Sequence, residues 1–245
     1  MLNMKTLYES LLDDDLVDKT DEMIIIDEIE TFLKANYRCK GSIKISEKPN
    51  KDDLYEVSSD SVVEVINKNI ISLTNGMFIW TIVDGGFYCN NCKFLKSLEG
   101  SPKEVGGGFY CYSCNSLKSL VGAPEKVGWG FSCNDCYSLT SLKGSPKEVG
   151  GGFYCSSCQS LKSLKGAPEK VEGTFYCSNC DSLKSLEGAP KKIGESFYCY
   201  KCKSLKSLEG APKKVEKHFN CSGCAIKFTV EDIRKISNVK GEIKC

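Results

Sequence analysis

The sequence is dominated by a block of 22 residues that returns at a fixed spacing along most of the chain. A typical copy reads F-Y-C-x-x-C-x-S-L-K-S-L-x-G-A-P-x-K-V; the first full copy begins at Phe87 and the last at Phe219. Self-similarity at such a period indicates stacked supersecondary units. One unit has too few apolar residues to bury a core alone, so the copies must pack on each other and a solenoid is predicted. The first cysteines of the copies are Cys89, Cys111, Cys133, Cys155, Cys177, Cys199 and Cys221.

The residues of one copy indicate how its chain runs. In Phe109–Cys111 the alternation predicts a short strand whose first and third side chains point inward. Leu117 and Leu120 follow at spacings that fit neither a helix nor a strand, which indicates a curved arc. The Gly122–Pro124 segment then turns the chain, because glycine tolerates positive φ and proline fixes φ. Val127 is expected to return to the core.

This repeat resembles the leucine-rich repeat, L-x-x-L-x-L-x-x-N/C-x-L. Phe109 and Cys111 match its apolar strand positions, Cys114 its Asn/Cys position and Leu117 the leucine that follows. The last spacing is one residue longer, and Gly106 stands where an apolar residue is expected. The repeat is also similar to those of uncharacterised proteins of bacteriophages and gut bacteria. The resemblance implies an α+β fold class, a leucine-rich-repeat-like β-solenoid with an α+β N-terminal cap and a C-terminal helical cap, but no particular activity.

Residues 1–60 are predicted to form the N-terminal cap. Apolar periodicity predicts a short helix over residues 4–17 and a second helix from an N-cap at Thr20 to about Tyr37. Two strands, 42–46 and 54–57, are expected to follow. The helix residues expected to face the core are Leu7, Leu11, Leu12, Leu16, Met23, Ile26, Ile29 and Leu33.

The solenoid is predicted over residues 61–228, with 61–84 as a divergent first coil. That coil begins with a strand at 62–66, and Asn67 takes the place of the second cysteine. From Leu73 to Leu98 there are 25 residues rather than 22, so we expect an extra loop that contains Met77–Val83. Terminal repeats are atypical because one of their faces meets water or a cap.

Residues 229–245 are predicted to form the C-terminal cap. Thr229–Asp232 resembles a capping box with Asp in place of Glu, and a helix is expected to follow it. Ile233 and Ile236 would face the last coil, and Gly241–Cys245 would trail from the helix as a tail.

Charge is unevenly distributed, although the whole chain carries only +1. Residues 1–84 hold 9 Lys and Arg against 17 Asp and Glu, a net charge of −8; the remaining 24 against 15 give residues 85–245 a net charge of +9. These two parts could contact each other, a partner, or another copy head to tail, and simple solvation is the favoured alternative. No signal peptide is evident, and the longest apolar runs are too short for a bilayer, so a cytoplasmic protein without membrane contact is predicted.

The cysteines could bind zinc, because C-x₂-C-x₁₈-C-x₂-C fits the spacing of a Cys₄ site. Three observations favour structural thiols. Seven C-x-x-C motifs cannot be paired without remainder, the first cysteine of each is predicted to point inward, and the second occupies a position where the repeat accepts cysteine. We therefore predict no metal and no cofactor. Iron–sulfur ligation is less favoured still, and Cys39 and Cys245 have no predicted role.

The outward strand positions are rich in tyrosine, with serine and asparagine between them. Such a surface offers large contact area and polar tips at low entropic cost, which suits protein recognition. The alternative is that tyrosine is there because it suits strands. The predicted partner-binding residues are Tyr88, Tyr110, Tyr112, Tyr154, Tyr176, Tyr198 and Tyr200.

A second surface is a column of lysines on the outer arc, interrupted by Thr140. Nucleic-acid binding there is disfavoured, because acidic residues are interspersed with the lysines.

Catalysis has little support, since the single histidine, His218, has no evident nucleophile beside it. The prediction is a non-enzymatic scaffold that binds a protein. The alternatives are a zinc-binding repeat protein that uses the seven C-x-x-C motifs and a small-ligand or nucleic-acid binder. The lysine column on the outer arc contains Lys96, Lys118, Lys162, Lys184 and Lys206.

Overall fold

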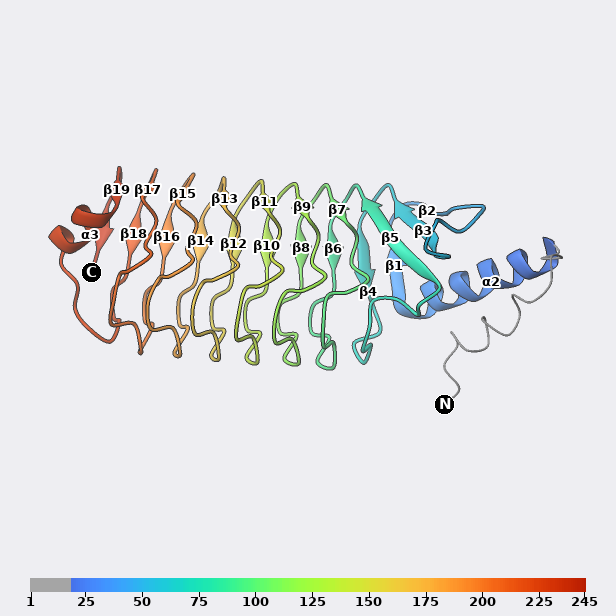
Figure 1. Cartoon of the computed structure of the whole chain (residues 1–245), viewed down its shortest axis with the longest axis horizontal. Helices are drawn as coiled ribbons and strands as arrows, with labels where there is room; N and C mark the ends of the chain where they lie inside the picture. Colours follow the sequence, from blue (N-terminus) through green and yellow to red (C-terminus); the bar gives the residue numbers. More distant parts are fainter. Residues whose placement is uncertain (1–18) are drawn as a thin grey trace.

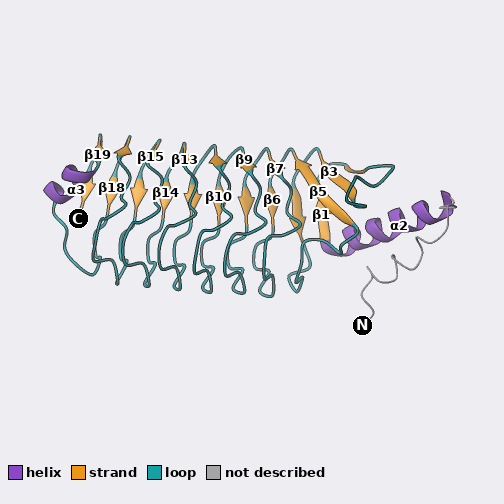
Figure 2. Cartoon of the chain, in the orientation of Figure 1, coloured by secondary structure: helices purple, strands orange, loops and turns teal. Residues whose placement is uncertain are grey.

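The computed structural model describes residues 19–245, and it shows a rod-shaped β-solenoid of about nine coils (Figure 1). Strands line two sides of the rod and loops join them, so that the described chain is mostly β (Figure 2). The predicted solenoid is thus confirmed. The expected helix over 4–17, its leucines and the side chain of Thr20 lie outside the described residues.

Each coil contributes one strand to each of two ten-stranded sheets. Sheet A is ordered β1 (Tyr37–Cys39), β4 (Val63–Val65), β6 (Phe87–Tyr88), β8 (Phe109–Tyr110), β10 (Phe131–Ser132), β12 (Phe153–Tyr154), β14 (Phe175–Tyr176), β16 (Phe197–Tyr198), β18 (Phe219–Asn220) and β20 (Ile243–Lys244). Sheet B is ordered β19 (Asn238–Val239), β17 (Lys214–Val215), β15 (Lys192–Ile193), β13 (Lys170–Val171), β11 (Glu148–Val149), β9 (Lys126–Val127), β7 (Glu104–Val105), β5 (Phe78–Val83), β3 (Tyr55–Ser59) and β2 (Ile43–Ile45).

The repeats pair in parallel with no shift of register, so each residue lies beside its equivalent in the next coil. The phenylalanine rings of sheet A therefore form a buried spine with neighbouring centroids 5.1–5.7 Å apart. Leu117 and Leu120 are fully buried, as the predicted arc requires. Val127 and its equivalents pack from the opposite sheet. The inward position of these valines was predicted from the sequence, but the second strand in which they lie was not.

The turn after the arc depends on glycine. Gly122 has a φ of 87°, and a Cβ there would lie 2.1 Å from the backbone nitrogen of Glu99 in the preceding coil. A side chain at this position would therefore clash with backbone as well as strain its own. The same conformation recurs in the equivalent turn of each regular coil, from Gly100 to Gly210.

The N-terminal end differs from the predictions at two points. Helix α2 (Lys19–Asn36) buries Ile29 and Leu33 as expected, but Met23 was predicted to be buried and is 69% exposed. The reason is that the first half of α2 extends beyond the sheets (Figure 1). The segment Met77–Val83 was predicted to be a loop, yet Phe78–Val83 forms strand β5, because Phe78, Trp80 and Val83 are all buried in the core.

The C-terminal end confirms one prediction and corrects another. The capping box is present: Thr229 Oγ1 accepts a hydrogen bond from the Asp232 backbone N–H, and Asp232 accepts one from the Thr229 N–H. Helix α3 (Val230–Ile236) follows, with Ile233 fully buried and Ile236 partly buried. The expected tail Gly241–Cys245 instead contains β20, whose pairing with β18 adds one more rung to sheet A. Among residues 19–245, neither helix is long and apolar enough to cross a bilayer.

Candidate binding surface

The outward side chains of sheet A form one continuous column, which we call the tyrosine column: Tyr88, Tyr110, Ser132, Tyr154, Tyr176 and Tyr198. Its tyrosines are half-buried because their rings lie on one another. Neighbouring centroids are 4.6–5.4 Å apart and the planes are within 21° of parallel. The strand spacing of about 4.8 Å is what brings equivalent rings into stacking contact.

The column is supported by the small residues beside it. Gly108 and Gly152 lie two positions before Tyr110 and Tyr154, on the same face of the strand, and a Cβ on either would come within 2.5 Å of the tyrosine hydroxyl. Each ring therefore lies across the backbone of its own coil. Burial first, and then the neighbouring Tyr88 and Tyr154, raise the pKa of Tyr110; burial and the neighbouring Tyr198 also raise the pKa of Tyr176. Both hydroxyls stay neutral at physiological pH.

The other two predicted site residues lie at the edge of this surface. Tyr112 is 39% exposed, and Tyr200 is half-buried with its ring 6.5 Å from that of Tyr198, nearly perpendicular to it. The structure thus brings Tyr154, Tyr176, Tyr198 and Tyr200 together in one group, and Tyr88 with Tyr110 in another. Ser132 separates the two groups and is itself 6% exposed.

Two aromatic residues outside the predicted set belong to the coil that carries Ser132. Trp129 is 71% exposed and Tyr137 is 49% exposed. An ideal Cβ on Gly130, next to Trp129, would lie 4.0 Å from the Tyr110 hydroxyl and 3.5 Å from the Tyr154 ring. Gly130 therefore lies between the two groups, and Trp129 directly precedes it in the chain. The signal was in the sequence, because the preceding and following coils have Gly107 and Gly151 at its position.

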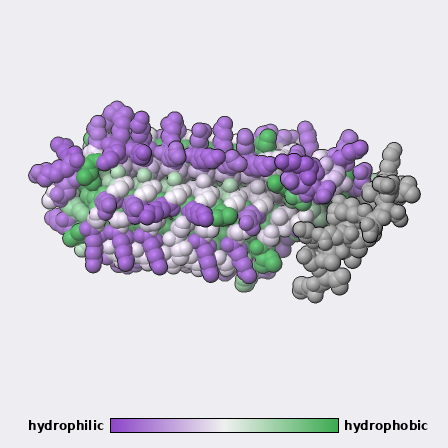
Figure 3. Space-filling view, viewed as in Figure 1, coloured by the Kyte–Doolittle hydropathy of each residue, from purple (hydrophilic) through white to green (hydrophobic). Residues whose placement is uncertain are grey.

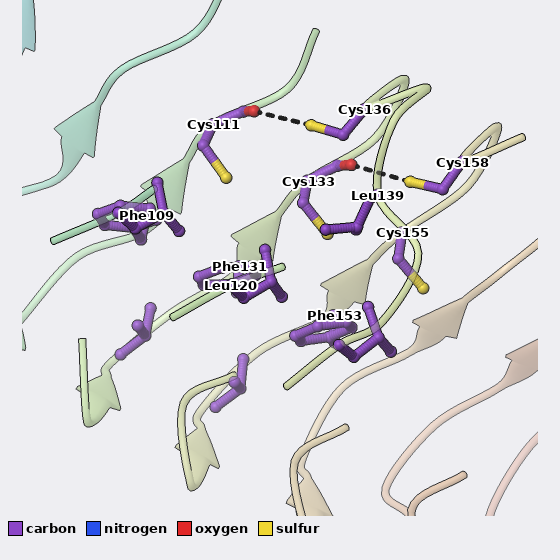
Figure 4. Close-up of a cluster of buried hydrophobic side chains, with 14 of the residues drawn as sticks. Phe109, Cys111, Leu120, Phe131, Cys133, Cys136, Leu139, Phe153, Cys155 and Cys158 are labelled. Carbon is purple, nitrogen blue, oxygen red and sulfur yellow. Dashed lines mark hydrogen bonds between the residues drawn. The ribbon is translucent and has the colours of Figure 1, made fainter. Parts of the chain in front are cut away.

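The cysteines form two further columns, and neither faces the surface. The first cysteine of each regular coil is buried beside the phenylalanine spine. The second donates its S–H to the backbone carbonyl of the first cysteine of the preceding coil, as Cys136 does to Cys111 and Cys158 to Cys133 (Figure 4). Six such bonds, with sulfur–oxygen distances of 3.0–3.3 Å, join the coils from Cys89 to Cys224.

The turn inside each C-x-x-C motif aims the two thiols apart. Its second middle residue has a positive φ, for example 57° at Asp135 and 59° at Ser157, and its N–H donates to a carbonyl of the next coil. The divergent first coil uses Asn67 at the second position, where its side chain bonds Asn36 Oδ1 at 2.8 Å. Cys245, which had no predicted role, follows β20 as Cys221 follows β18 and so extends the first column.

Burial keeps the thiols of the first column neutral. It raises the pKa of Cys133 to about 12, and it also raises the pKa of Cys155, Cys177 and Cys199. In the second column, hydrogen bonding to Cys202 lowers the pKa of Cys224 to about 7, and hydrogen bonding to Cys114 lowers that of Cys92. Zinc binds the thiolate, which the first-column sites disfavour. Within residues 19–245, no three His, Cys, Asp or Glu side chains are grouped as a metal ion would require.

The remaining candidates lie on the outside of the rod. The lysines of the outer arc are exposed, and Thr140, which interrupts them, donates to the carbonyl of Lys118 at 3.1 Å. Figure 3 shows hydrophilic side chains in rows that run along the rod, with paler surface between them. His218 is exposed, and its Nδ1 accepts a hydrogen bond from the backbone N–H of Glu242 at 3.1 Å.

No protein-family model matches the chain, and comparisons with curated proteins and with solved structures give no match either.

Proposed function

We propose that the protein is a non-enzymatic scaffold that binds a partner protein through the tyrosine column. The observation that carries the proposal is the stacking of tyrosine rings on a strand face whose own column bears no charge from Tyr88 to Tyr198. A stacked ring has already lost most of its rotational freedom, so binding orders little that was free. Tyrosine also dominates binding energy at many protein interfaces.

The dimensions support a protein partner. At a strand spacing of about 4.8 Å, the group from Tyr154 to Tyr198 extends about 10 Å, and the whole column from Tyr88 extends about 24 Å. Tyr200, whose ring lies 6.5 Å from that of Tyr198, widens this strip beyond the column itself. A strip of this length is comparable with one side of a standard interface, which buries about 800 Å² per partner.

We also propose that the repeat is related to leucine-rich repeats and to those of phage or bacterial repeat proteins, and that the protein works in a reducing, cytoplasmic compartment. Both proposals are supported by the column of second cysteines, which occupy the Asn/Cys position of the leucine-rich repeat and act as S–H donors. Thiol donors of this kind require cysteines that stay reduced.

The test is affinity capture from the native host with matched variants, read by quantitative mass spectrometry. One variant changes Tyr154, Tyr176 and Tyr198 to Phe, which keeps the stack and removes the polar tips; a second changes them to Ser. The control changes Lys162, Lys184 and Lys206 to Gln on the outer arc. We expect the Ser variant to lose the partner, the Phe variant to weaken it, and the Gln variant to retain it.

The opposite pattern would contradict the proposal. If the Gln variant loses the partner while the folded Ser variant retains it, the binding surface is the outer arc. That binding would also weaken steeply with salt, as contacts between lysines and an anionic partner do. Circular dichroism melts of all three variants show that each is folded at the temperature of the capture experiment.

A further inference from the structure

The outer face of sheet B carries charge in a regular alternation that stops near the C-terminal end. In register, Glu104 faces Lys126, Lys126 faces Glu148, and Glu148 faces Lys170. The residues one position earlier alternate in the opposite phase, and among them Lys147 pairs with Glu125 at 3.7 Å. Opposite charges directly across neighbouring strands stabilise a sheet, so this part of the face is electrostatically balanced.

The last two regular coils break the pattern. Lys170 faces Lys192, and Lys192 faces Lys214, so three like charges lie in register. Like charges placed directly opposite destabilise a sheet, and nothing in the repeat requires them, because the earlier coils avoid them. Lys170 and Lys214 pair with Glu172 and Glu216, which directly follow the same strands. We call Lys170, Lys191, Lys192, Lys213 and Lys214 the lysine patch.

Part of this patch forms no ion pair in the described chain, although Glu169 lies in register beside Lys191. Among residues 19–245, Lys191, Lys192 and Lys213 form no ion pair within 4.0 Å. Lys213 also lines a hollow beside helix α3, whose apolar wall includes Leu208, Phe228 and Ile236. Its charged lining consists of Lys213, Lys235, Glu209 and Asp232, and Asp232 is already bonded to Thr229. The C-terminal end thus combines unpaired positive charge with an adjoining apolar surface.

The opposite end of the rod carries the complementary chemistry. The projecting half of α2 exposes Met23 (69%) and Ile24 (57%), and Asp27 and Glu28 are exposed one turn further on (Figure 1). Within residues 19–245 these two carboxylates form no ion pair. The acidic character extends over the whole first part of the chain, since residues 1–84 carry −8 and residues 85–245 carry +9.

We infer that the protein associates head to tail with a second copy of itself: the projecting half of α2 of one copy docks at the lysine patch and the α3 hollow of the next. Asp27 and Glu28 would lie against Lys191, Lys192 and Lys213, while Met23 and Ile24 cover the apolar wall. The two surfaces differ, so the contact is heterologous and leaves a free end on each copy for further addition. Charge complementarity of this kind mainly speeds association and sets its orientation.

The first test is the mass of the full chain in solution, by analytical ultracentrifugation at two salt concentrations. At about 20 mM NaCl the mean mass should rise with protein concentration above the 27.0 kDa of one chain, and at about 500 mM NaCl it should return to that value because exposed charges are screened. A chain that stays monomeric at low salt up to about 100 μM, a range in which weak contacts of this kind become populated, overturns the inference.

A charge-swap experiment then assigns the surfaces. Variant one carries Lys191→Glu, Lys192→Glu and Lys213→Glu; variant two carries Asp27→Lys and Glu28→Lys. Each alone should stay monomeric at low salt, because its two ends then carry charge of the same sign, and mixing the two should restore association. The control, Lys96→Glu with Lys118→Glu and Lys162→Glu, removes the same charge from the outer arc and should assemble like the wild type.

Each other outcome counts against the inference. Association of variant one alone would place the contact elsewhere, and failure of the folded variants to associate on mixing would show that these ends do not meet. A control that is monomeric would indicate a general effect of net charge. The tyrosine column is unchanged in every variant, so partner capture by these proteins reports on the proposed scaffold function separately.

Discussion

Sheet A and sheet B are built from the same coils in the same register, yet the residues that repeat on their outer faces differ in kind. Sheet A repeats tyrosine on both sides of Ser132, and within each group the neighbouring rings stack at 4.6–5.4 Å. Sheet B alternates Glu104, Lys126, Glu148 and Lys170. In-register stacking places each side chain against its own equivalent, so identity is favourable for aromatic rings and unfavourable for charges.

The same rule explains the interior. Phenylalanine and cysteine can repeat in every coil because stacked rings and neutral thiols tolerate their own kind. A column of buried thiolates would repel itself, and the raised pKa values keep the column neutral. The tyrosine, phenylalanine and cysteine columns repeat residues that tolerate contact with their own kind, whereas the exposed lysine column of the outer arc and the lysine patch each repeat a like charge.

The largest effect should come from alkaline pH, which ionises the cysteines of the unfolded chain before those of the folded chain. The folded pKa of Cys133 is about 12, and burial raises those of Cys155, Cys177 and Cys199 above the unfolded value near 9. Between these values the unfolded chain loses protons that the folded chain keeps, so stability is complete below about pH 8 and falls as pH rises beyond 9. Four such thiols would together lower the free energy of unfolding by about 5 kcal/mol per pH unit.

Denaturant melts between pH 7 and 11 measure this effect. A loss comparable with the whole stability of a small domain should unfold the rod well below pH 12. Cys155→Ala should make the dependence shallower by about one thiol, or roughly 1.4 kcal/mol per pH unit. An unchanged slope in that variant would show that the alkaline transition has another origin.

The next effect separates the two sheets by their buried residues. Phe153→Ala in sheet A should lower the free energy of unfolding by about 3–5 kcal/mol, because it removes one ring from a close-packed spine. Val149→Ala, in sheet B of the same coil, should lower it by only about 2 kcal/mol, because fewer buried methyl groups are lost. Urea denaturation measures both, and a larger loss at Val149 would reverse the ranking of the sheets.

A smaller effect concerns the hydrogen bonds of the second cysteines. Cys158→Ala removes the donor to the Cys133 carbonyl and should cost about 1–2 kcal/mol, because that buried acceptor loses its S–H partner. Cys158→Ser, which keeps a donor, should recover part of the loss. Equal melting of the two variants would mean that the thiol acts only through its volume.

The smallest effect should arise on the charged face. Glu148→Lys would join Lys126 to Lys170, Lys192 and Lys214 in one run of five lysines in register, and should lower stability by less than about 1 kcal/mol. Lys192→Glu should give a gain of similar size, because it restores the alternation. Both differences should shrink at about 500 mM NaCl, where the Debye length is only a few ångströms. Differences that persist in salt would indicate packing rather than charge.

The sequence predicts the regular coils well because their period is fixed. Once the inward positions of one copy are known, as at Phe109, Cys111 and Leu117, the period gives the equivalent positions in every other copy. The equivalent residues of the regular coils are buried in the structure. The second strand escaped prediction because Lys126–Val127 lies between a proline turn and glycines and has a single apolar residue, so no alternation is visible. The tyrosine column follows from the same period, whereas the exposure of Trp129 depends on its coil alone.

The ends could not be derived from the period, because they do not share it. Met23 fits the apolar stripe of α2, but whether a stripe is buried depends on where the sheets end, which no local pattern records. In the final coil, Ile243 follows Phe219 after 24 residues and α3 lies between them, so the 22-residue period is not visible there. The charge pattern of sheet B becomes visible only when residues 22 apart are known to be paired.

The parallel pairing along the rod also has a mechanical consequence. The hydrogen bonds between coils, such as that from the Phe131 N–H to the Gly152 carbonyl, run along the axis of the rod. Tension between the two ends would therefore open one rung at a time from the weaker end, rather than shear many rungs at once. Each rupture would release one coil of 22 residues, about 70 Å of contour length. Under load the molecule would therefore lengthen in equal steps, one coil at a time.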